Sequence, residues 1–281
     1  GVLVACWNRY TSTIPNPAPA EVKPLSIASA SPMLLFEIVT LAIVQGIGEF
    51  LPISSSGHVV VLAALFDQIG QPIPDKLTIN VVLHLGTLLA IVVFYRRRIL
   101  ALLGPDRRLI GLVLVGSIPA AIVGLGLKLR LEDALENPLL AGLMFPVTGV
   151  MLIWARRMGA GGRICRELSL RQAILIGCFQ ALAILPGISR SGSTIVAGLV
   201  AGLDRNEAAT FSFLLAIPAI AGAGVIECLH LFRRSAEGTS PDALFVGAGL
   251  SFAVGLISLW WLIRWMEQGK LHCFAWWLFL L

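Results

Sequence analysis

Two segments of this sequence resemble one another, and each interrupts a long apolar stretch with proline, glycine and hydroxyl residues. The first runs from Gln45 to His58 and reads QGIGEFLPISSSGH, and the second runs from Gln180 to Thr194 and reads QALAILPGISRSGST. In both, a glutamine, a Leu-Pro pair and a serine cluster follow in the same order. Because the pattern occurs once in each half, we expect two related halves, residues 33–155 and 172–281.

The composition places these segments in a membrane. Hydrophobic residues make up 57% of the chain and charged residues 13%, whereas about 25% of a soluble domain is charged. We therefore expect a single membrane domain over residues 32–281, preceded by a proline-rich, mobile tail over residues 1–31. Five uninterrupted apolar spans are predicted at residues 77–95, 109–127, 139–155, 208–231 and 243–263.

The proline residues within the repeated segments predict where the other two apolar stretches are broken. Pro52 and the pair Pro186 and Gly187 cannot continue a regular helix. Irregular backbone at membrane depth is tolerated where it lines a polar cavity. The predicted fold is an all-α polytopic membrane protein, an inverted repeat whose two interrupted, re-entrant helix pairs meet at a central polar site.

Two arginine-rich loops predict the orientation. One follows the first span and the other precedes the second interrupted segment, so two spans separate them and both lie on one side. The positive-inside rule makes that side cytoplasmic. The net charge of +5 therefore reports membrane orientation, and no nucleic-acid partner is expected.

The first break carries candidate metal and catalytic groups. Gln45 and Glu49 share one helix face at i and i+4. A carboxylate with an amide carbonyl suits Mg²⁺ or Ca²⁺, although Glu49 would equally suit a hydrogen bond to the broken backbone. Ser55 and His58, three residues apart, bring a hydroxyl within reach of an imidazole base. Ser54 and Ser56 are candidate caps of the helix that restarts near Gly57.

The second break predicts an anion site. Ser189, Arg190, Ser191 and Thr194 stand at the start of an apolar helix, where free backbone N–H groups and hydroxyls bind phosphate. The planar guanidinium of Arg190 matches phosphate oxygens. Together, the two breaks offer the charge neutralisation and positioning that phosphoryl transfer requires.

Both motifs, with the regions around Leu83–Ala90 and Phe211–Ala219, resemble the bacterial undecaprenyl-diphosphatase, or bacitracin-resistance, family over residues 33–281. The resemblance implies hydrolysis of undecaprenyl diphosphate, with a divalent cation, at a site open to the outer face of the bacterial inner membrane. It implies that the catalytic residues are Glu49, Ser55, His58 and Arg190, and that the metal ligands are Gln45 and Glu49. The residues that it implies bind the substrate phosphates are Ser54, Ser56, Ser189, Arg190, Ser191 and Thr194.

The resemblance further implies recycling of the lipid carrier of cell-wall precursors. The expected partners are the polyprenyl diphosphate substrate, membrane lipids and a second copy of the chain in a homodimer. Attack by Ser55 with His58 as base, and attack by a water activated by His58, both stay open.

Three alternatives use the same residues differently. A lipid-phosphate or anion transporter would also place broken helices at a midplane site. An intramembrane serine protease would use Ser55 and His58 but gives no role to Glu49 or Arg190. A phosphatase of the phosphatidic-acid type needs a Lys/Arg-Pro motif upstream and a second histidine downstream, and no suitably placed pair is evident.

Overall fold

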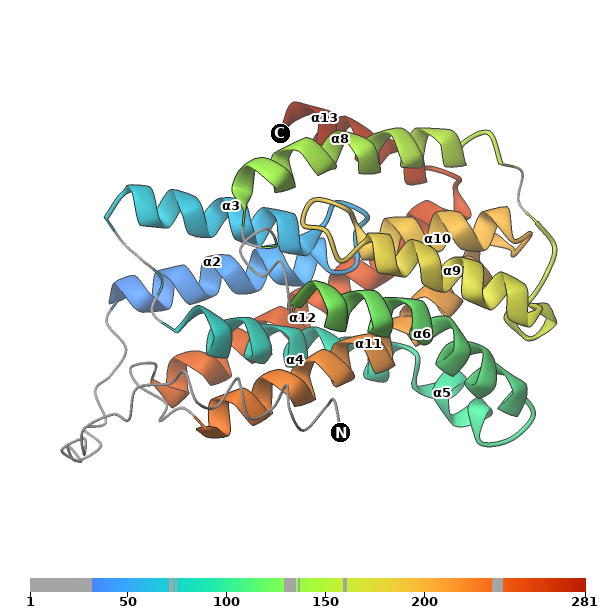
Figure 1. Ribbon diagram of the computed structural model, residues 1–281, viewed down its shortest axis with the longest axis horizontal. Coiled ribbons are helices and arrows are strands. Elements are labelled where there is room, and N and C mark those ends of the chain that lie inside the picture. The colour runs from blue at the N-terminus through green and yellow to red at the C-terminus, as the bar shows by residue number, and fades with distance from the viewer. Residues whose placement is uncertain are drawn as a thin grey trace, which may run out of the picture.

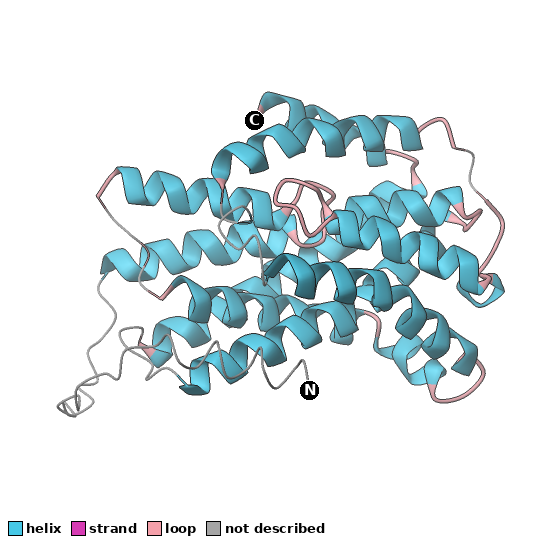
Figure 2. Cartoon of the chain, viewed as in Figure 1, coloured by secondary structure: helices cyan, strands magenta, loops and turns pink. Residues whose placement is uncertain are grey.

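The computed structural model describes residues 32–70, 73, 75–128, 135, 137–158, 161–233 and 240–281. The predicted tail over residues 1–31 lies outside this part of the chain. The described residues are helical, apart from turns, loops and one isolated bridge between Arg163 and Leu203 (Figure 2). The helices are α2 (Pro32–Gly48), α3 (Ser55–Gln68), α4 (Lys76–Phe94), α5 (Arg96–Leu102), α6 (Arg107–Lys128), α8 (Pro138–Ala155), α9 (Leu170–Leu182), α10 (Arg190–Val200), α11 (Arg205–Arg233), α12 (Pro241–Glu267) and α13 (Phe274–Leu280).

Five of these helices are long and apolar enough to cross a membrane: α4, α6, α8, α11 and α12. They coincide with the five predicted spans, so an all-α polytopic membrane protein is confirmed. The agreement follows from composition, since a run of about 20 apolar residues has few other stable environments.

Two helical hairpins, α2–α3 and α9–α10, are the interrupted segments. Their helices are too short to span, and the breaks over residues 49–54 and 183–189 contain Pro52, Pro186 and Gly187 as predicted. Figure 1 shows the hairpins entering from opposite ends of the molecule, with their tips meeting at the centre. Helix α8 packs across α3 and α10 above this junction, and α13 packs on α8.

Glycines allow the hairpin tips to touch. A Cβ on Gly57 would lie 2.8 Å from the Cα of Gly187 and 2.6 Å from a ring carbon of Phe145 in α8. Gly187 itself has a φ of 91°, in the left-handed region, and its Cβ would collide with the carbonyl oxygen of Ala141. The two tips and α8 therefore meet backbone to backbone.

We expect Gly187→Ala to destabilise the protein by about 2–4 kcal/mol, because a left-handed φ costs about 1–2 kcal/mol and overpacking costs a similar amount. Thermal unfolding in detergent should show a clearly lower Tm. Gly142→Ala is the matched control, since a Cβ at this α8 position meets nothing within 4 Å. Equal Tm values for the two variants would contradict the proposed close packing.

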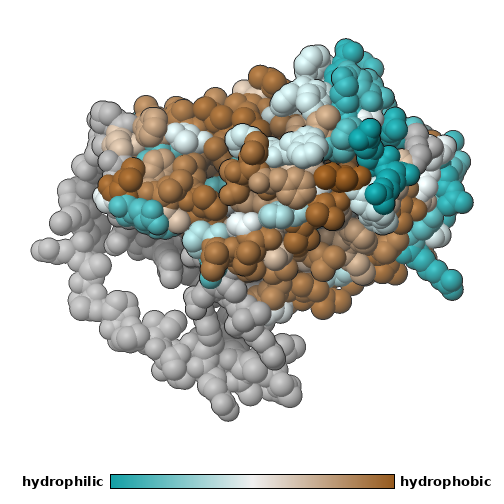
Figure 3. Space-filling model, turned by 90° about the horizontal axis from the view of Figure 1, so that it is seen from above, coloured by the Kyte–Doolittle hydropathy of each residue, from teal (hydrophilic) through white to brown (hydrophobic). Residues whose placement is uncertain are grey.

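Ion pairs tie together the arginine-rich end of the molecule. Arg98 donates to both carboxylate oxygens of Glu207, at 3.1 and 2.8 Å, and lies 3.5 Å from Asp106. The N–H of Cys165 also donates to Glu207, at 2.7 Å. Burial and the neighbouring Glu207 carboxylate raise the pKa of the Cys165 thiol, which keeps this loop cysteine neutral. Figure 3 shows hydrophilic residues gathered at one end, beside a broad hydrophobic surface.

Candidate active site

An ion pair joins the two hairpin tips. The guanidinium Nη2 of Arg190, at the start of α10, lies 2.6 Å from Oε1 of Glu49, just after α2. The Glu49 side chain is 7% exposed and that of Arg190 is 16% exposed. Phe213 of α11 lies beneath the guanidinium, with its ring centroid 5.9 Å from the Arg190 Cζ. A buried charge pair of this kind needs further hydrogen bonds to be stable.

Those hydrogen bonds come from residues of the first hairpin. The Ser55 hydroxyl donates to Oε2 of Glu49 at 2.7 Å, and the Gln45 amide donates to the same oxygen at 3.1 Å. Both side chains are buried. The sequence-predicted residues Gln45, Glu49, Ser55 and Arg190 are therefore brought together, with Glu49 at their centre.

His58 points away from Ser55. Its Nδ1 lies 2.7 Å from the Ser54 carbonyl oxygen, and the indole N–H of Trp277 in α13 donates to its Nε2 at 3.0 Å. Both nitrogens are thus engaged, and the donation by Trp277 requires Nδ1 to carry the proton. No hydrogen bond between Ser55 and His58 is present in the described structure, because the Ser55 hydroxyl donates to Glu49 instead.

Ser54 and Ser189 hold the two helix starts. Ser54 caps α3 by accepting from the Gly57 N–H at 3.3 Å, with a strained φ of 70°. Ser189 caps α10 by accepting from the Gly192 N–H at 3.1 Å. Ser56 is exposed, with its hydroxyl 3.4 Å from that of Ser54. The capping prediction for Ser54 is confirmed, although α3 begins at Ser55, earlier than predicted.

Two further candidates of the second break, Ser191 and Thr194, connect α10 to neighbouring parts of the chain. Ser191 lies 3.3 Å from the Leu51 carbonyl oxygen, across the junction. Thr194 donates to the Arg190 carbonyl at 2.8 Å and lies 2.5 Å from the Ser212 hydroxyl of α11. These hydroxyls are fully buried, so they fix the backbone around Arg190. Their binding of phosphate stays a prediction.

One donor of the cluster has no partner. The second terminal nitrogen of Arg190, Nη1, is buried and has no hydrogen-bond partner among the described residues. A buried unpaired N–H donor is costly, and Arg190 can keep its bond to Glu49 while Nη1 contacts a phosphate oxygen.

His84 of α4 is a member of the site that sequence reasoning missed. Its Nε2 lies 3.9 Å from Oε2 of Glu49, and its Nδ1 lies 2.8 Å from the Asn80 carbonyl oxygen. A lone histidine in an apolar span has no partner at helical spacing, so the sequence alone favours a helix contact. It is the one histidine or charged residue in the predicted span 77–95, and this is the signal that could have found it.

The second hairpin has no counterpart of the Gln45–Glu49 pair. Gln180 corresponds to Gln45 in the repeat, but Ile184 stands where Glu49 would be. Gln180 is 3% exposed, and neither of its amide atoms has a partner among the described residues. The two hairpins thus contribute different chemistry to the junction.

Glu49 and Gln45 are the available donors for a metal ion. Among the described residues, no three His, Cys, Asp or Glu side chains converge as a metal centre. Glu49 already accepts from Arg190, Ser55 and Gln45. One carboxylate and one amide suit an ion such as Mg²⁺ that is held mainly by substrate phosphates. Metal binding by Gln45 and Glu49 stays a prediction.

A buried acid, hydroxyl and arginine within a membrane domain indicate phosphate chemistry, and comparisons with known proteins point the same way. The family model described as "Bacitracin resistance protein BacA" matches residues 38–281. The chain belongs to the BacA family. Within it, the undecaprenyl-diphosphatase of Rhodopirellula baltica is 51% identical over 244 residues, which is 86% of this chain and 93% of the relative.

Other BacA-family relatives match over a similar length. An undecaprenyl-diphosphatase 4 of Bacillus cereus is 40% identical over 242 residues, covering 85% of this chain and 91% of the relative. The undecaprenyl-diphosphatase of Trichlorobacter lovleyi is 38% identical over 257 residues, covering 87% of this chain and 93% of the relative. The range of the family model, residues 38–281, includes all five spans, both breaks and all but the start of α2.

Proposed function

We propose that this chain hydrolyses undecaprenyl diphosphate to undecaprenyl phosphate and inorganic phosphate, recycling the lipid carrier for cell-wall synthesis and conferring bacitracin resistance. The observation that carries the proposal is the Glu49–Arg190 pair at the junction of the hairpins, with the Ser55 hydroxyl on one side and the unpaired Arg190 Nη1 on the other. The names of the BacA-family relatives supply the substrate.

Arg190 would bind the diphosphate. Its Nη1 donates to an oxygen of the terminal phosphate while Nη2 remains on Glu49. Donors of this kind are already oriented before the reaction, so they stabilise the charge that develops in the transition state without having to move. The α10 N-terminus behind Arg190 adds a favourable dipole for the same anion. Ser189, Ser191 and Thr194 keep that helix start in place.

Ser55 would act as the nucleophile. Its oxygen attacks the terminal phosphorus while its proton passes to Oε2 of Glu49, 2.7 Å away. The bond from that phosphorus to the bridging oxygen breaks, and undecaprenyl phosphate leaves with the electron pair. Water then hydrolyses the phosphoserine, releasing inorganic phosphate and restoring the hydroxyl.

The two histidines have separate roles in this proposal. His84, whose Nε2 lies 3.9 Å from Glu49 and whose side chain is 29% exposed, would relay a proton between the carboxylate and the exposed edge of the site. His58 would activate the water of the second step after release from Trp277. The earlier alternative, in which His58 serves as the first base, requires its ring to turn toward Ser55.

A divalent cation, Mg²⁺ or Ca²⁺, would be held by Glu49 and Gln45 together with the diphosphate, where it supplies charge neutralisation. We expect phosphate release by the purified protein in Mg²⁺ to fall at least about tenfold in EDTA and to recover when Mg²⁺ is restored. Release that is unchanged by EDTA would contradict the metal assignment, while leaving the phosphatase assignment intact.

We infer an inverted repeat in the inner membrane. The opposed entry of the two hairpins supports the repeat, and so does their packing: α12 of the second half packs on α2, and α6 of the first half packs on α9. The arginine-rich end would face the cytoplasm, and the diphosphate would reach the site from the periplasmic face. A homodimer stays a prediction, which the molecular mass in detergent would test.

Phosphate release from undecaprenyl diphosphate by purified protein tests the activity itself. The main alternative is a lipid-phosphate or anion transporter, which the opposed hairpins would also suit. Binding of the lipid without phosphate release, in protein that unfolds cooperatively, would overturn the phosphatase assignment and favour transport.

A further inference from the structure

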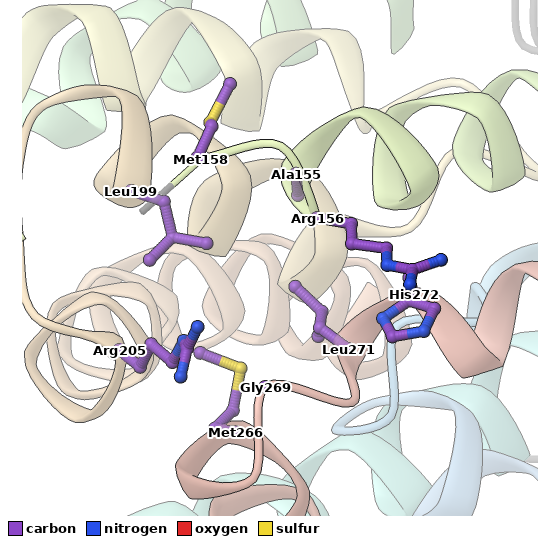
Figure 4. Close-up of a pocket in the computed structure, with 9 residues that line it drawn as sticks. All are labelled: Ala155, Arg156, Met158, Leu199, Arg205, Met266, Gly269, Leu271 and His272. Carbon is purple, nitrogen blue, oxygen red and sulfur yellow. The ribbon is translucent and has the colours of Figure 1, made fainter. Parts of the chain in front are cut away.

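A small pocket lies away from the hairpin junction, at the arginine-rich end of the molecule. Figure 4 shows its lining, which comes from the end of α8, the end of α10, the start of α11 and the turn after α12. Three lining residues are basic, Arg156, Arg205 and His272, and none of the described residues that line the pocket is acidic. Leu199, Met266 and Leu271 make its apolar part.

The basic groups of this pocket lack counter-ions. Among the described residues, neither Arg156 nor Arg205 forms a salt bridge. Nδ1 of His272 is buried and unpaired within the same part of the chain. Because buried polar atoms in proteins are almost always paired, Nδ1 of His272 is a polar group that a ligand of this pocket could pair with.

Arg205 connects the start of α11 with the turn that ends α12. It is the first residue of α11, where the helix dipole disfavours a cation. Its guanidinium packs against Gly269, whose φ is 69°, and a Cβ there would lie 3.2 Å from three guanidinium atoms. The turn after α12 therefore leaves space for this guanidinium in the pocket wall.

The pocket lies beside the ends of three candidate membrane spans. Helix α8 ends at Ala155, α11 begins at Arg205 and α12 ends at Glu267, and all three are candidate spans. The ends of spans lie at the depth of lipid headgroups, where basic residues attract anionic lipids. A pocket lined by basic and apolar residues at this depth suits a phosphate headgroup joined to an acyl chain.

We propose that this pocket binds the phosphate headgroup of an anionic membrane lipid, with Arg156, Arg205 and His272 contacting the phosphate and Leu199, Met266 and Leu271 contacting the start of the chain. Soluble phosphate shares the anionic chemistry but would gain nothing from the apolar residues. The proposal does not depend on the proposed phosphatase activity, because these residues lie outside the junction.

Native mass spectrometry of the full chain in detergent tests this site. The protein is titrated with phosphatidylglycerol, phosphatidylcholine or inorganic phosphate. We expect phosphatidylglycerol to bind more tightly than phosphatidylcholine. Since each arginine near a membrane surface contributes about fivefold, Arg205→Gln should weaken phosphatidylglycerol binding about fivefold, and Arg156→Gln with Arg205→Gln about thirtyfold.

Arg157→Gln is the matched control, since Arg157 is the exposed neighbour of Arg156 and does not line the pocket. It should bind phosphatidylglycerol like the wild type. If the double variant does not unfold cooperatively, Arg205→Lys and Arg205→Gln are compared instead, and only the glutamine should lose affinity. Equal lipid affinity in wild type and Arg205→Gln would overturn the proposal. Displacement of phosphatidylglycerol by millimolar phosphate, with no preference for the lipid, would overturn the lipid assignment.

Discussion

Arg190→Ala lowers the kcat of phosphate release by about 10²–10³, the usual effect of removing a preorganised donor to a developing charge. Arg190 is expected to contribute twice, through Nη2 bound to Glu49 at 2.6 Å and through Nη1, which has no partner in the described structure. Because Nη1 acts only once substrate arrives, the loss should appear mainly in kcat. Steady-state kinetics with undecaprenyl diphosphate measures it.

Removing Arg190 also leaves Glu49 buried without its counter-charge, which can cost about 3–5 kcal/mol of stability. Two further variants separate folding from chemistry. Arg190→Lys keeps the charge but loses the planar fork, so it should fold normally yet remain well below wild-type activity. Arg171→Ala removes an exposed arginine and should leave the rate unchanged. A loss of tenfold or less in cooperatively folded Arg190→Ala would refute the role of Arg190.

Glu49→Gln should lower kcat by about 10³, since loss of a positioned general base costs about 10²–10⁴. The amide keeps the size of the side chain but can neither take the Ser55 proton nor hold a cation as a carboxylate does. The matched control is Glu37→Gln, the same change on the same hairpin. Glu37 is also buried, but it lies three turns from Glu49, about 18 Å along α2.

The coupling between Glu49 and Ser55 can be measured directly. If they act as one unit, Glu49→Gln with Ser55→Ala should be no slower than Glu49→Gln alone. Losses that multiply would show that Ser55 works with another base, and His58 would then be the first candidate. A Glu37→Gln variant as slow as Glu49→Gln would contradict the assignment of Glu49 as the base.

The spans and the breaks could be predicted because each depends on a local property of the sequence. Apolar length defines α4, α6, α8, α11 and α12. The breaks contain Pro52, Pro186 and Gly187, but proline alone does not end a helix in this chain, because Pro119, Pro146 and Pro218 lie inside spans. The meeting of Glu49 and Arg190 was predictable only through the repeat, which implied that the two breaks converge.

The partners inside the site could not be predicted from spacing. Helical spacing favoured a bond between Ser55 and His58, but the chain leaves the helix after Gly48, and its reversal brings Ser55 back to Glu49. Trp277 reaches His58 from a helix of seven residues packed on α8. His84 approaches Glu49 from another helix. Such contacts depend on tertiary packing, which no local pattern encodes.

The unequal hairpins suggest how such a site could arise in evolution. Measured from the shared glycines, Gly57 and Gly192, Ser55 and Arg190 occupy equivalent positions, as do Glu49 and Ile184. If the halves descend from one duplicated gene, the ancestral copies carried identical residues at each pair of positions. Ser55 and Glu49 would then have been kept in the first copy and Arg190 in the second. Neither half could lose its part of the site without loss of activity. On that history Gln180, buried and without a partner among the described residues, would be a remnant of the earlier symmetry.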